Sequence, residues 1–204
     1  MVLNLKTVCQ HWLRPWAIIL LAISPGAYCQ SHELVLAFDP AKTTVNFTLG
    51  DVIHTVHGQF DLNRGSINFN PENGAVGGDI VINAVSGRSG NNTRDRKMHR
   101  EVLESDRYPE ITFRADHVDE KVASPGTTTV PVHGTFSVHG TAHEITIPVR
   151  VELADDHWNA TAHFVIPYVK WGMKNPSTFI LRVSESVEID VHASGSIPRP
   201  SGPR

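Results

Sequence analysis

Apolar and polar residues alternate with a period of two along most of the chain beyond Leu34. In residues 44–49 (TVNFTL), for example, Val45, Phe47 and Leu49 alternate with polar neighbours. Successive side chains of a strand point to opposite faces, so this pattern is typical of strands with one buried and one exposed face. Turn-forming clusters at residues 63–65, 70–74, 124–126 and 155–156 interrupt the pattern, and the last predicted strand runs from Phe179 to Ala193. We predict an all-β domain of eight or nine antiparallel strands, arranged as a meander in a sandwich or barrel.

One segment departs from this alternation and predicts a single short helix over about residues 94–105 (RDRKMHREVLES). Thr93 or Asp95 would cap its first turn, and Pro109 prevents its continuation into the strand that begins at Glu110. Its apolar stripe is too narrow for a buried helix and consists of Met98, Val102 and Leu103. We therefore expect the helix to lie across one end of the strand domain or over its side.

The first residues have the organisation of a secretory signal peptide. Lys6 and Arg14 precede an apolar run at residues 16–23 (WAIILLAI), and small residues follow it. The run is shorter than the ~20 residues that cross a bilayer, so we expect no transmembrane segment. Residues 1–29 would be removed by cleavage before Gln30, and lipidation of Cys29 is the alternative. We expect a periplasmic or secreted protein.

The cysteine positions and the composition of the C-terminus define the expected domain. Both cysteines, Cys9 and Cys29, lie within the predicted signal peptide, so the mature chain would contain no disulfide. Residues 197–204 are rich in proline, and we expect a disordered tail there. One barrel domain would then occupy residues 30–196.

Charge and motifs exclude several classes of function. The net charge is −3 with histidine neutral, which gives no electrostatic attraction to nucleic acid. His54 and His57 are three residues apart on a predicted strand and so point to opposite faces, and we predict no metal site and no cofactor. The chain lacks a Gly-x-Ser-x-Gly motif, so we predict a protein that is not an enzyme. An envelope hydrolase whose carboxylates meet only on folding stays open as an alternative.

The apolar faces of the strands have two interpretations. An eight-stranded barrel is just wide enough either to be filled by its own side chains or to hold one ligand. A hydrocarbon chain threaded through an open interior would gain roughly 0.8 kcal/mol for each buried methylene group. The cations of the helix, Arg94, Arg96 and Lys97, either face solvent or meet an anionic headgroup at the barrel mouth, because arginine suits phosphate through its paired donors.

Several motifs together resemble one known family. The most specific is an ordered set from the helix to the following strand: Arg94-Asp95, Met98-His99, Leu103-Glu104-Ser105 and Tyr108-Pro109-x-Ile111-x-Phe113. Further matching segments are residues 54–60 (HTVHGQF), 65–70 (GSINFN), 80–86, 132–136, 145–149 and 172–191, and Val-His-Gly occurs at 56–58, 132–134 and 138–140. The chain thereby resembles the YceI-like proteins of the bacterial envelope over almost its whole predicted mature length.

The resemblance implies an eight-stranded antiparallel, lipocalin-like barrel that binds a polyisoprenoid or a similar long-chain amphiphilic lipid. It also implies a periplasmic or secreted binding or carrier protein, often a homodimer, without established catalysis. A stress-response interaction protein with an incidental cavity is a further alternative. From strand parity and the predicted rim, we expect the ligand-binding residues to be Phe47, Leu49, Ile80, Ile82, Arg94, Ile111, Phe113, Ile147, Val149, Phe164, Ile166, Tyr168 and Trp171.

Overall fold

The computed structural model describes residues 33–50, 54–70, 73–118, 126–154, 156–178 and 182–197, all of which lie in one unit of the chain, residues 31–204. The predicted signal peptide, most of the predicted tail, and two residues of the predicted turn at 124–126 lie outside the described residues.

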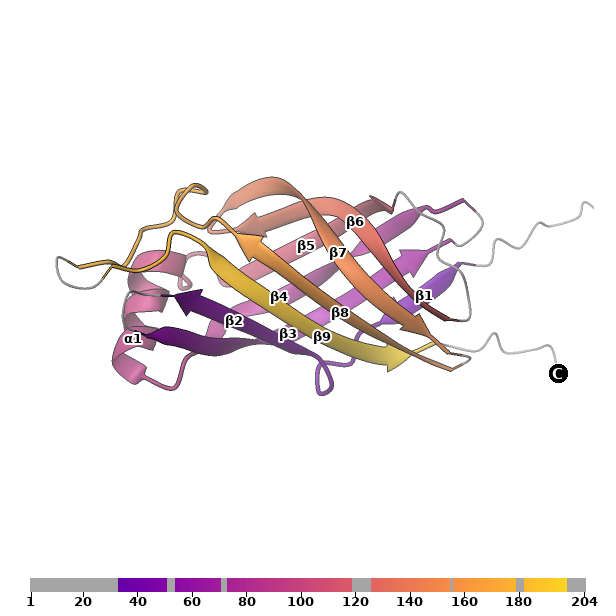
Figure 1. Cartoon of the computed structure of the whole chain (residues 1–204), viewed down its shortest axis with the longest axis horizontal. Helices are drawn as coiled ribbons and strands as arrows, with labels where there is room; N and C mark the ends of the chain where they lie inside the picture. Colours follow the sequence, from indigo (N-terminus) through magenta and orange to yellow (C-terminus); the bar gives the residue numbers. More distant parts are fainter. Residues whose placement is uncertain are drawn as a thin grey trace, which may run out of the picture. The chain divides into compact units, whose positions relative to one another are not determined.

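In the described part of the chain, nine strands form one antiparallel sheet that closes on itself (Figure 1). They are β1 (Leu34–Ala37), β2 (Thr44–Gly50), β3 (Thr55–Phe69), β4 (Val76–Arg88), β5 (Glu110–Val118), β6 (Gly126–Val138), β7 (Thr141–Leu153), β8 (His157–Ile166) and β9 (Val187–Ser196). Strands β2 to β9 each pair with their neighbours in the chain, and β9 pairs with β2. Strand β1 pairs with residues 66–69 of β3, whereas β2 pairs with residues 55–60 of the same strand. Strand β1 is therefore not one of the eight strands that form the closed ring. The prediction of an eight-stranded antiparallel barrel with one short helix is confirmed.

Two predicted strand boundaries were wrong. The turn expected at residues 63–65 is absent, because β3 runs through it and its pairing with β4 shifts register between Leu62 and Arg64. Such a bulge inserts one extra residue and bends a long strand without ending it. The last strand was expected to begin at Phe179, which lies outside the described residues, but β9 begins only at Val187. Before it, the Ser184 amide donates to the Gly50 carbonyl (2.9 Å) instead of continuing the ladder.

The helical segment covers one end of the barrel, which is one of the two placements expected from the sequence (Figure 1). It comprises α1 (Asn92–Lys97) and a π-helical turn η1 (Met98–Leu103), so it begins and ends two residues earlier than expected. The cap is Asn91, whose side chain accepts hydrogen bonds from the Thr93 and Arg94 amides (3.0 and 3.1 Å). Asp95 instead accepts from the Ser89 amide at 2.9 Å. No residue of α1 or η1 is fully buried, which agrees with the narrow apolar stripe.

His99 fastens this helical segment to the barrel. Its Nε2 lies 2.8 Å from the Gly87 carbonyl oxygen of β4, and its Nδ1 lies 3.0 Å from the hydroxyl of the buried Ser105. Because a carbonyl oxygen only accepts, Nε2 carries a proton and donates it to Gly87, and Nδ1 lies within hydrogen-bond distance of the Ser105 hydroxyl. The side chain thus joins both ends of η1 to one strand.

The core consists of three clusters spread along the barrel. At the end covered by the helix, which we call the helix end, Val138, Ile166, Tyr168 and Met173 are buried together. At the opposite end, which we call the β1 end, the buried cluster comprises Phe69, Val130, Leu153, Trp158 and Ala193. Between them lie Val45, Leu62 and Ile82. The buried side chains inside the barrel therefore form three separate clusters instead of one continuous core.

Candidate functional site

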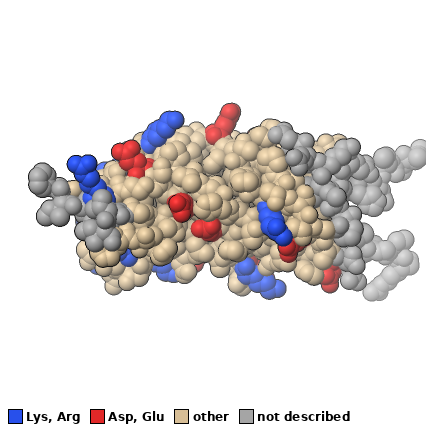
Figure 2. All heavy atoms as spheres, viewed as in Figure 1, with Lys and Arg blue, Asp and Glu red and all other residues tan. Residues whose placement is uncertain are grey.

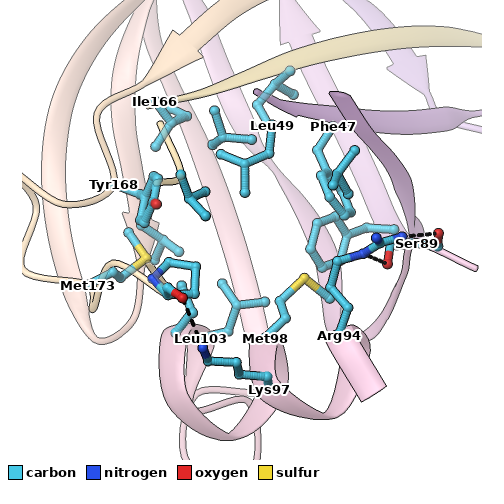
Figure 3. A pocket seen from close by; sticks show the side chains of 18 of the residues that line it. Phe47, Leu49, Ser89, Arg94, Lys97, Met98, Leu103, Ile166, Tyr168 and Met173 are labelled. Atoms are coloured by element: carbon cyan, nitrogen blue, oxygen red, sulfur yellow. Dashed lines mark hydrogen bonds between the residues drawn. The ribbon is translucent and has the colours of Figure 1, made fainter. Parts of the chain in front are cut away.

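A large apolar chamber lies under the helical segment and has a volume of about 470 Å³ (Figure 3). We call it the helix-end chamber. Its walls come from six strands, from the helical segment and from the segment between β8 and β9, so it occupies the barrel interior. Its apolar lining comprises Phe47, Leu49, Val56, Phe60, Met98, Val102, Leu103, Ile111, Phe136, Val138, Ile166, Tyr168, Met173, Pro176, Val183, Val187 and Ile189.

The alternation of β2 shows why these side chains point inward. Phe47 and Leu49 line the chamber, whereas Thr48 between them faces outward and its hydroxyl lies 3.1 Å from His57 Nδ1 on the neighbouring strand. The same parity directs the apolar residues of β8 inward and leaves Val165 about half exposed. Period-two alternation thus produces an apolar interior and a polar outer surface.

The recurring Val-His-Gly motif has a structural role in this interior. Gly58 pairs with Phe47, and a Cβ at Gly58 would collide with the Phe47 ring. A Cβ at Gly134 would lie 2.8 Å from the Phe113 ring, and one at Gly140 would meet the ring of Tyr108. At each motif the glycine therefore leaves room for an aromatic ring from another segment.

Most of the polar lining residues of the chamber lie around the start of the helical segment. Arg94 donates from Nε to the Ser89 hydroxyl (2.7 Å) and from Nη2 to the Ser89 carbonyl (2.8 Å). Lys97 Nζ donates to the Pro176 carbonyl at 2.9 Å and so joins the helix to the opposite loop. Because Arg94 and Thr178 are exposed and also line the chamber, the chamber reaches the surface here. Figure 3 shows Arg94 beside Ser89 and Lys97 on the helix that borders the chamber.

Only two of the three cations considered from the sequence line the mouth. Arg96 is exposed and absent from the chamber lining, and its Nη2 lies 3.2 Å from the Thr93 hydroxyl oxygen. Residues Arg94 and Lys97 are three apart and therefore share one helical face, from which Arg96 is rotated.

A second contact holds the loop beyond β8 against η1. Glu101 accepts from Arg100 Nη2 and from Lys174 Nζ, each at 2.9 Å. The hydrogen bond from Arg100 and then that from Lys174 lower the pKa of the Glu101 carboxyl to about 2. Its bridge to Lys174 and the one from Lys97 to Pro176 connect the same two segments, beside the mouth.

Tyr168 contributes a neutral polar group to the chamber wall. Its hydroxyl donates to the Ser184 carbonyl at 2.7 Å, and only 5% of the residue is exposed. Burial, assisted by the nearby Glu185 carboxylate, raises the pKa of Tyr168 to about 12. The phenol thus stays uncharged at neutral pH, and the described chamber wall contains no Asp, Glu, His or Cys.

A smaller chamber of about 110 Å³ lies at the β1 end, and we call it the β1-end chamber. All of its described lining residues are apolar, among them Phe38, Phe69, Val130 and Trp158. Most of them belong to the buried cluster of that end or pack against it.

The thirteen residues expected from the sequence are divided among these regions. Those that line the helix-end chamber are Phe47, Leu49, Arg94, Ile111, Ile166 and Tyr168. Those that line the β1-end chamber are Ile80, Phe113 and Val149. Those found in neither lining are Ile82, Ile147, Phe164 and Trp171. Trp171 stacks on His143, with ring centroids 4.1 Å apart, and packs against the helix-end cluster. Ligand contact stays a prediction for the whole set.

The structure adds chamber residues that the expected site did not include. Strand alternation could have identified most of them, such as Phe60, Phe136 and Ile189, and the helix stripe marked Met98, Val102 and Leu103. By contrast, Met173 and Pro176 lie in a loop without periodicity, so no pattern pointed to them. Only the fold of the loop over the barrel end brings them to the chamber.

Neither a metal site nor a spanning helix is found in the part of the chain that the structure describes. Within these residues, no three His, Cys, Asp or Glu side chains gather in a way that could hold a metal ion. No helix among them combines the length and the apolar character needed to cross a membrane.

Comparisons with known proteins show which solved structures share this fold. No curated protein sequence matches the chain. Among solved structures, Burkholderia cenocepacia BcnA is 18% identical, with 78% of this chain and 99% of that chain covered and a TM-score of 0.64. A polyisoprenoid binding domain from Saccharophagus degradans implicated in plant cell wall breakdown is 17% identical, covers 81% of this chain and 99% of its own, and has a TM-score of 0.66. The YceI protein of Campylobacter jejuni is 18% identical, covers 72% of this chain and 88% of its own, and has a TM-score of 0.59.

These structural similarities show a shared fold. A family model, that of the YceI-like domain, matches residues 36–194 and so covers nearly all of the barrel. The chain therefore belongs to the YceI-like family.

Proposed function

We propose that this protein binds a polyisoprenoid or a similar long-chain lipid in the helix-end chamber and sequesters or carries it in the periplasm or outside the cell. The observation that carries the proposal is an apolar chamber of about 470 Å³ inside the barrel, with a mouth that bears two cations. Its volume falls within the range of about 300–1,000 Å³ that is typical of small-molecule sites.

The chamber volume is sufficient for tight binding without polar contacts. An apolar protein cavity of about 150 Å³ holds benzene, so each carbon atom takes roughly 25 Å³. At that ratio 470 Å³ holds about 19 carbon atoms. At roughly 0.8 kcal/mol per carbon, their burial contributes about 15 kcal/mol, which offsets an association cost of about 4–15 kcal/mol.

The mouth favours a ligand with one polar end. Lys97 uses one ammonium donor on Pro176, and an ammonium has three. Arg94 is held at the rim by Ser89. In Figure 2, basic and acidic side chains are interspersed over the visible face, which therefore carries no broad patch of one charge. The proposed ligand places its chain in the chamber and its polar head near Arg94 and Lys97.

Two further observations support a binding role. The described lining lacks the Asp, Glu and His side chains that the hydrolase alternative would need for acid–base chemistry. A protein with the same fold, from Saccharophagus degradans, is a polyisoprenoid binding domain. The proposed location rests on the signal-peptide pattern of residues 1–29.

Native mass spectrometry of the protein purified without detergent, followed by organic extraction, tests the proposal. We expect an adduct of one long-chain lipid per chain that is lost on extraction and regained when the stripped protein is incubated with geranylgeraniol. A stripped, folded protein that binds neither geranylgeraniol nor its phosphate would contradict the proposal. Release of inorganic phosphate and geranylgeraniol from added geranylgeranyl phosphate would support the hydrolase alternative instead.

A further inference from the structure

The two chambers are separated by a wall of three apolar side chains. We call Val45, Leu62 and Ile82 the partition; they are 6–9% exposed and belong to the lining of neither chamber. Side chains on both sides pack against it: Phe60, Ile111 and Ile189 from the helix-end chamber, and Phe38 and Ile80 from the β1-end chamber. The partition therefore stands between the two chambers.

Strand pairing places the three partition residues next to one another. Leu62 of β3 lies directly opposite Ile82 of β4, and Val45 of β2 lies opposite Phe60, two residues before Leu62 on β3. The three side chains thus come from adjacent strands at about the same level of the barrel. Ile147 on β7 is also buried and lines neither chamber; on its strand it lies between Ile145, which packs against the helix-end cluster, and Val149, which lines the β1-end chamber.

We propose that the partition sets the length of the isoprenoid chain that the protein accepts, an inference that rests on the proposed function. The helix-end chamber has room for about 19 carbons, close to four isoprene units, when the polar head lies at the mouth. The β1-end chamber, at 110 Å³, has room for about four carbons, close to one further unit. A fifth unit can be buried only where the partition is open. Val45, Leu62 and Ile82 are then the residues that determine chain-length specificity.

Prenyl alcohols of three, four, five and six isoprene units provide the test, each measured by competition against a fluorescent prenyl probe. In the unmodified protein, affinity rises up to four units and then levels off, because further units stay in water. In Ile82→Ala the two chambers join, and the five-unit alcohol binds about tenfold or more tighter than it binds the unmodified protein. If Ile82→Ala does not fold, Ile82→Val takes its place. This smaller truncation should shift the chain-length limit in the same direction.

Val130→Ala is the matched control. Val130 is 2% exposed and lines the β1-end chamber, so its truncation enlarges that chamber and leaves the partition closed. Val45→Ala removes the same atoms from the partition itself. We expect Val45→Ala to favour the five-unit alcohol and Val130→Ala to keep the four-unit limit, while both lose a similar amount of thermal stability.

The outcomes separate this inference from the function on which it rests. If no prenyl alcohol of any length binds the unmodified protein, the proposed function fails and the inference with it. If the alcohols bind but affinity keeps rising beyond four units, the partition does not limit chain length. The inference is likewise overturned if folded Ile82→Val and Val45→Ala keep the four-unit limit, or if Val130→Ala shifts it equally.

Discussion

Replacement of the mouth cations should weaken binding of a prenyl phosphate and leave binding of the corresponding alcohol almost unchanged. The change is Arg94→Gln combined with Lys97→Gln, which keeps polar side chains at the mouth and removes both charges. A unit charge pair 4 Å apart contributes about 1 kcal/mol in water and about 4 kcal/mol at an effective dielectric constant near 20. Arg94 is exposed and Lys97 half-buried, so we expect a value near the lower limit for each.

About 1.4 kcal/mol per cation corresponds to a tenfold change in Kd, so the double variant should bind geranylgeranyl phosphate about 100-fold more weakly. Competition binding measures the two Kd values for geranylgeranyl phosphate. Because added salt screens an exposed charge pair, the difference in Kd between the unmodified protein and the double variant should be smaller at the higher of two salt concentrations. Arg96→Gln is the matched control: Arg96 lies on the same helix but outside the chamber lining. Equal losses for alcohol and phosphate, or an equal loss in Arg96→Gln, would refute a headgroup site at Arg94 and Lys97.

Three other changes test the chamber, the loop bridge and the aromatic packing. Phe47→Arg places a charge among the apolar lining and should abolish retention of geranylgeraniol in native mass spectrometry, whereas Val165→Arg, at an outward and half-exposed position, should retain it. Glu101 has its pKa lowered from 4.5 to about 2 by its hydrogen bonds from Arg100 and Lys174, so these interactions stabilise the fold fully above pH 4.5 and are lost as the pH falls towards 2. Thermal melts should therefore show a steeper loss of stability over that range in the unmodified protein than in Glu101→Gln. Gly134→Ala introduces a Cβ against the Phe113 ring and the Arg114 carbonyl and should lower the free energy of unfolding by about 1–3 kcal/mol, while Gly77→Ala, with open space around its Cβ position, should have little effect.

Each of these three predictions has a result that would contradict it. Retention of lipid by a folded Phe47→Arg protein would place the ligand outside the helix-end chamber. Parallel melting curves for Glu101→Gln and the unmodified protein between pH 4.5 and 2 would show that the Glu101 bridges do not contribute to stability. An unfolding free energy for Gly134→Ala equal to that of Gly77→Ala would mean that the Phe113 ring moves aside without cost.

The periodicity of the sequence was sufficient for the barrel but not for its irregular positions. Alternation identified the strands because one face of each is buried in the interior. It failed at residues 63–65, where asparagine, arginine and glycine are typical of a turn but form a bulge within β3. It also missed Asn91 as the helix cap, because Thr93 and Asp95 nearby are equally suitable residue types.

For the candidate site, parity gave the direction of a side chain but not its level along the barrel. Leu49 and Ile80 both belong to inward faces, yet they line different chambers. Level depends on the register between strands and on where packing closes the interior, and neither follows from the alternation of a single strand. The mouth depends in addition on the loop that brings Met173 and Pro176 over the helix end, and that loop has no periodic pattern.

A crystal structure of the protein with bound geranylgeranyl phosphate tests the central claim most directly. We predict continuous density for the chain inside the barrel, from a phosphate near Arg94 and Lys97 to a last isoprene unit against Ile82. A chain bound on the outer surface, or an interior in which the side chains close the helix-end chamber while lipid is bound elsewhere, would contradict it.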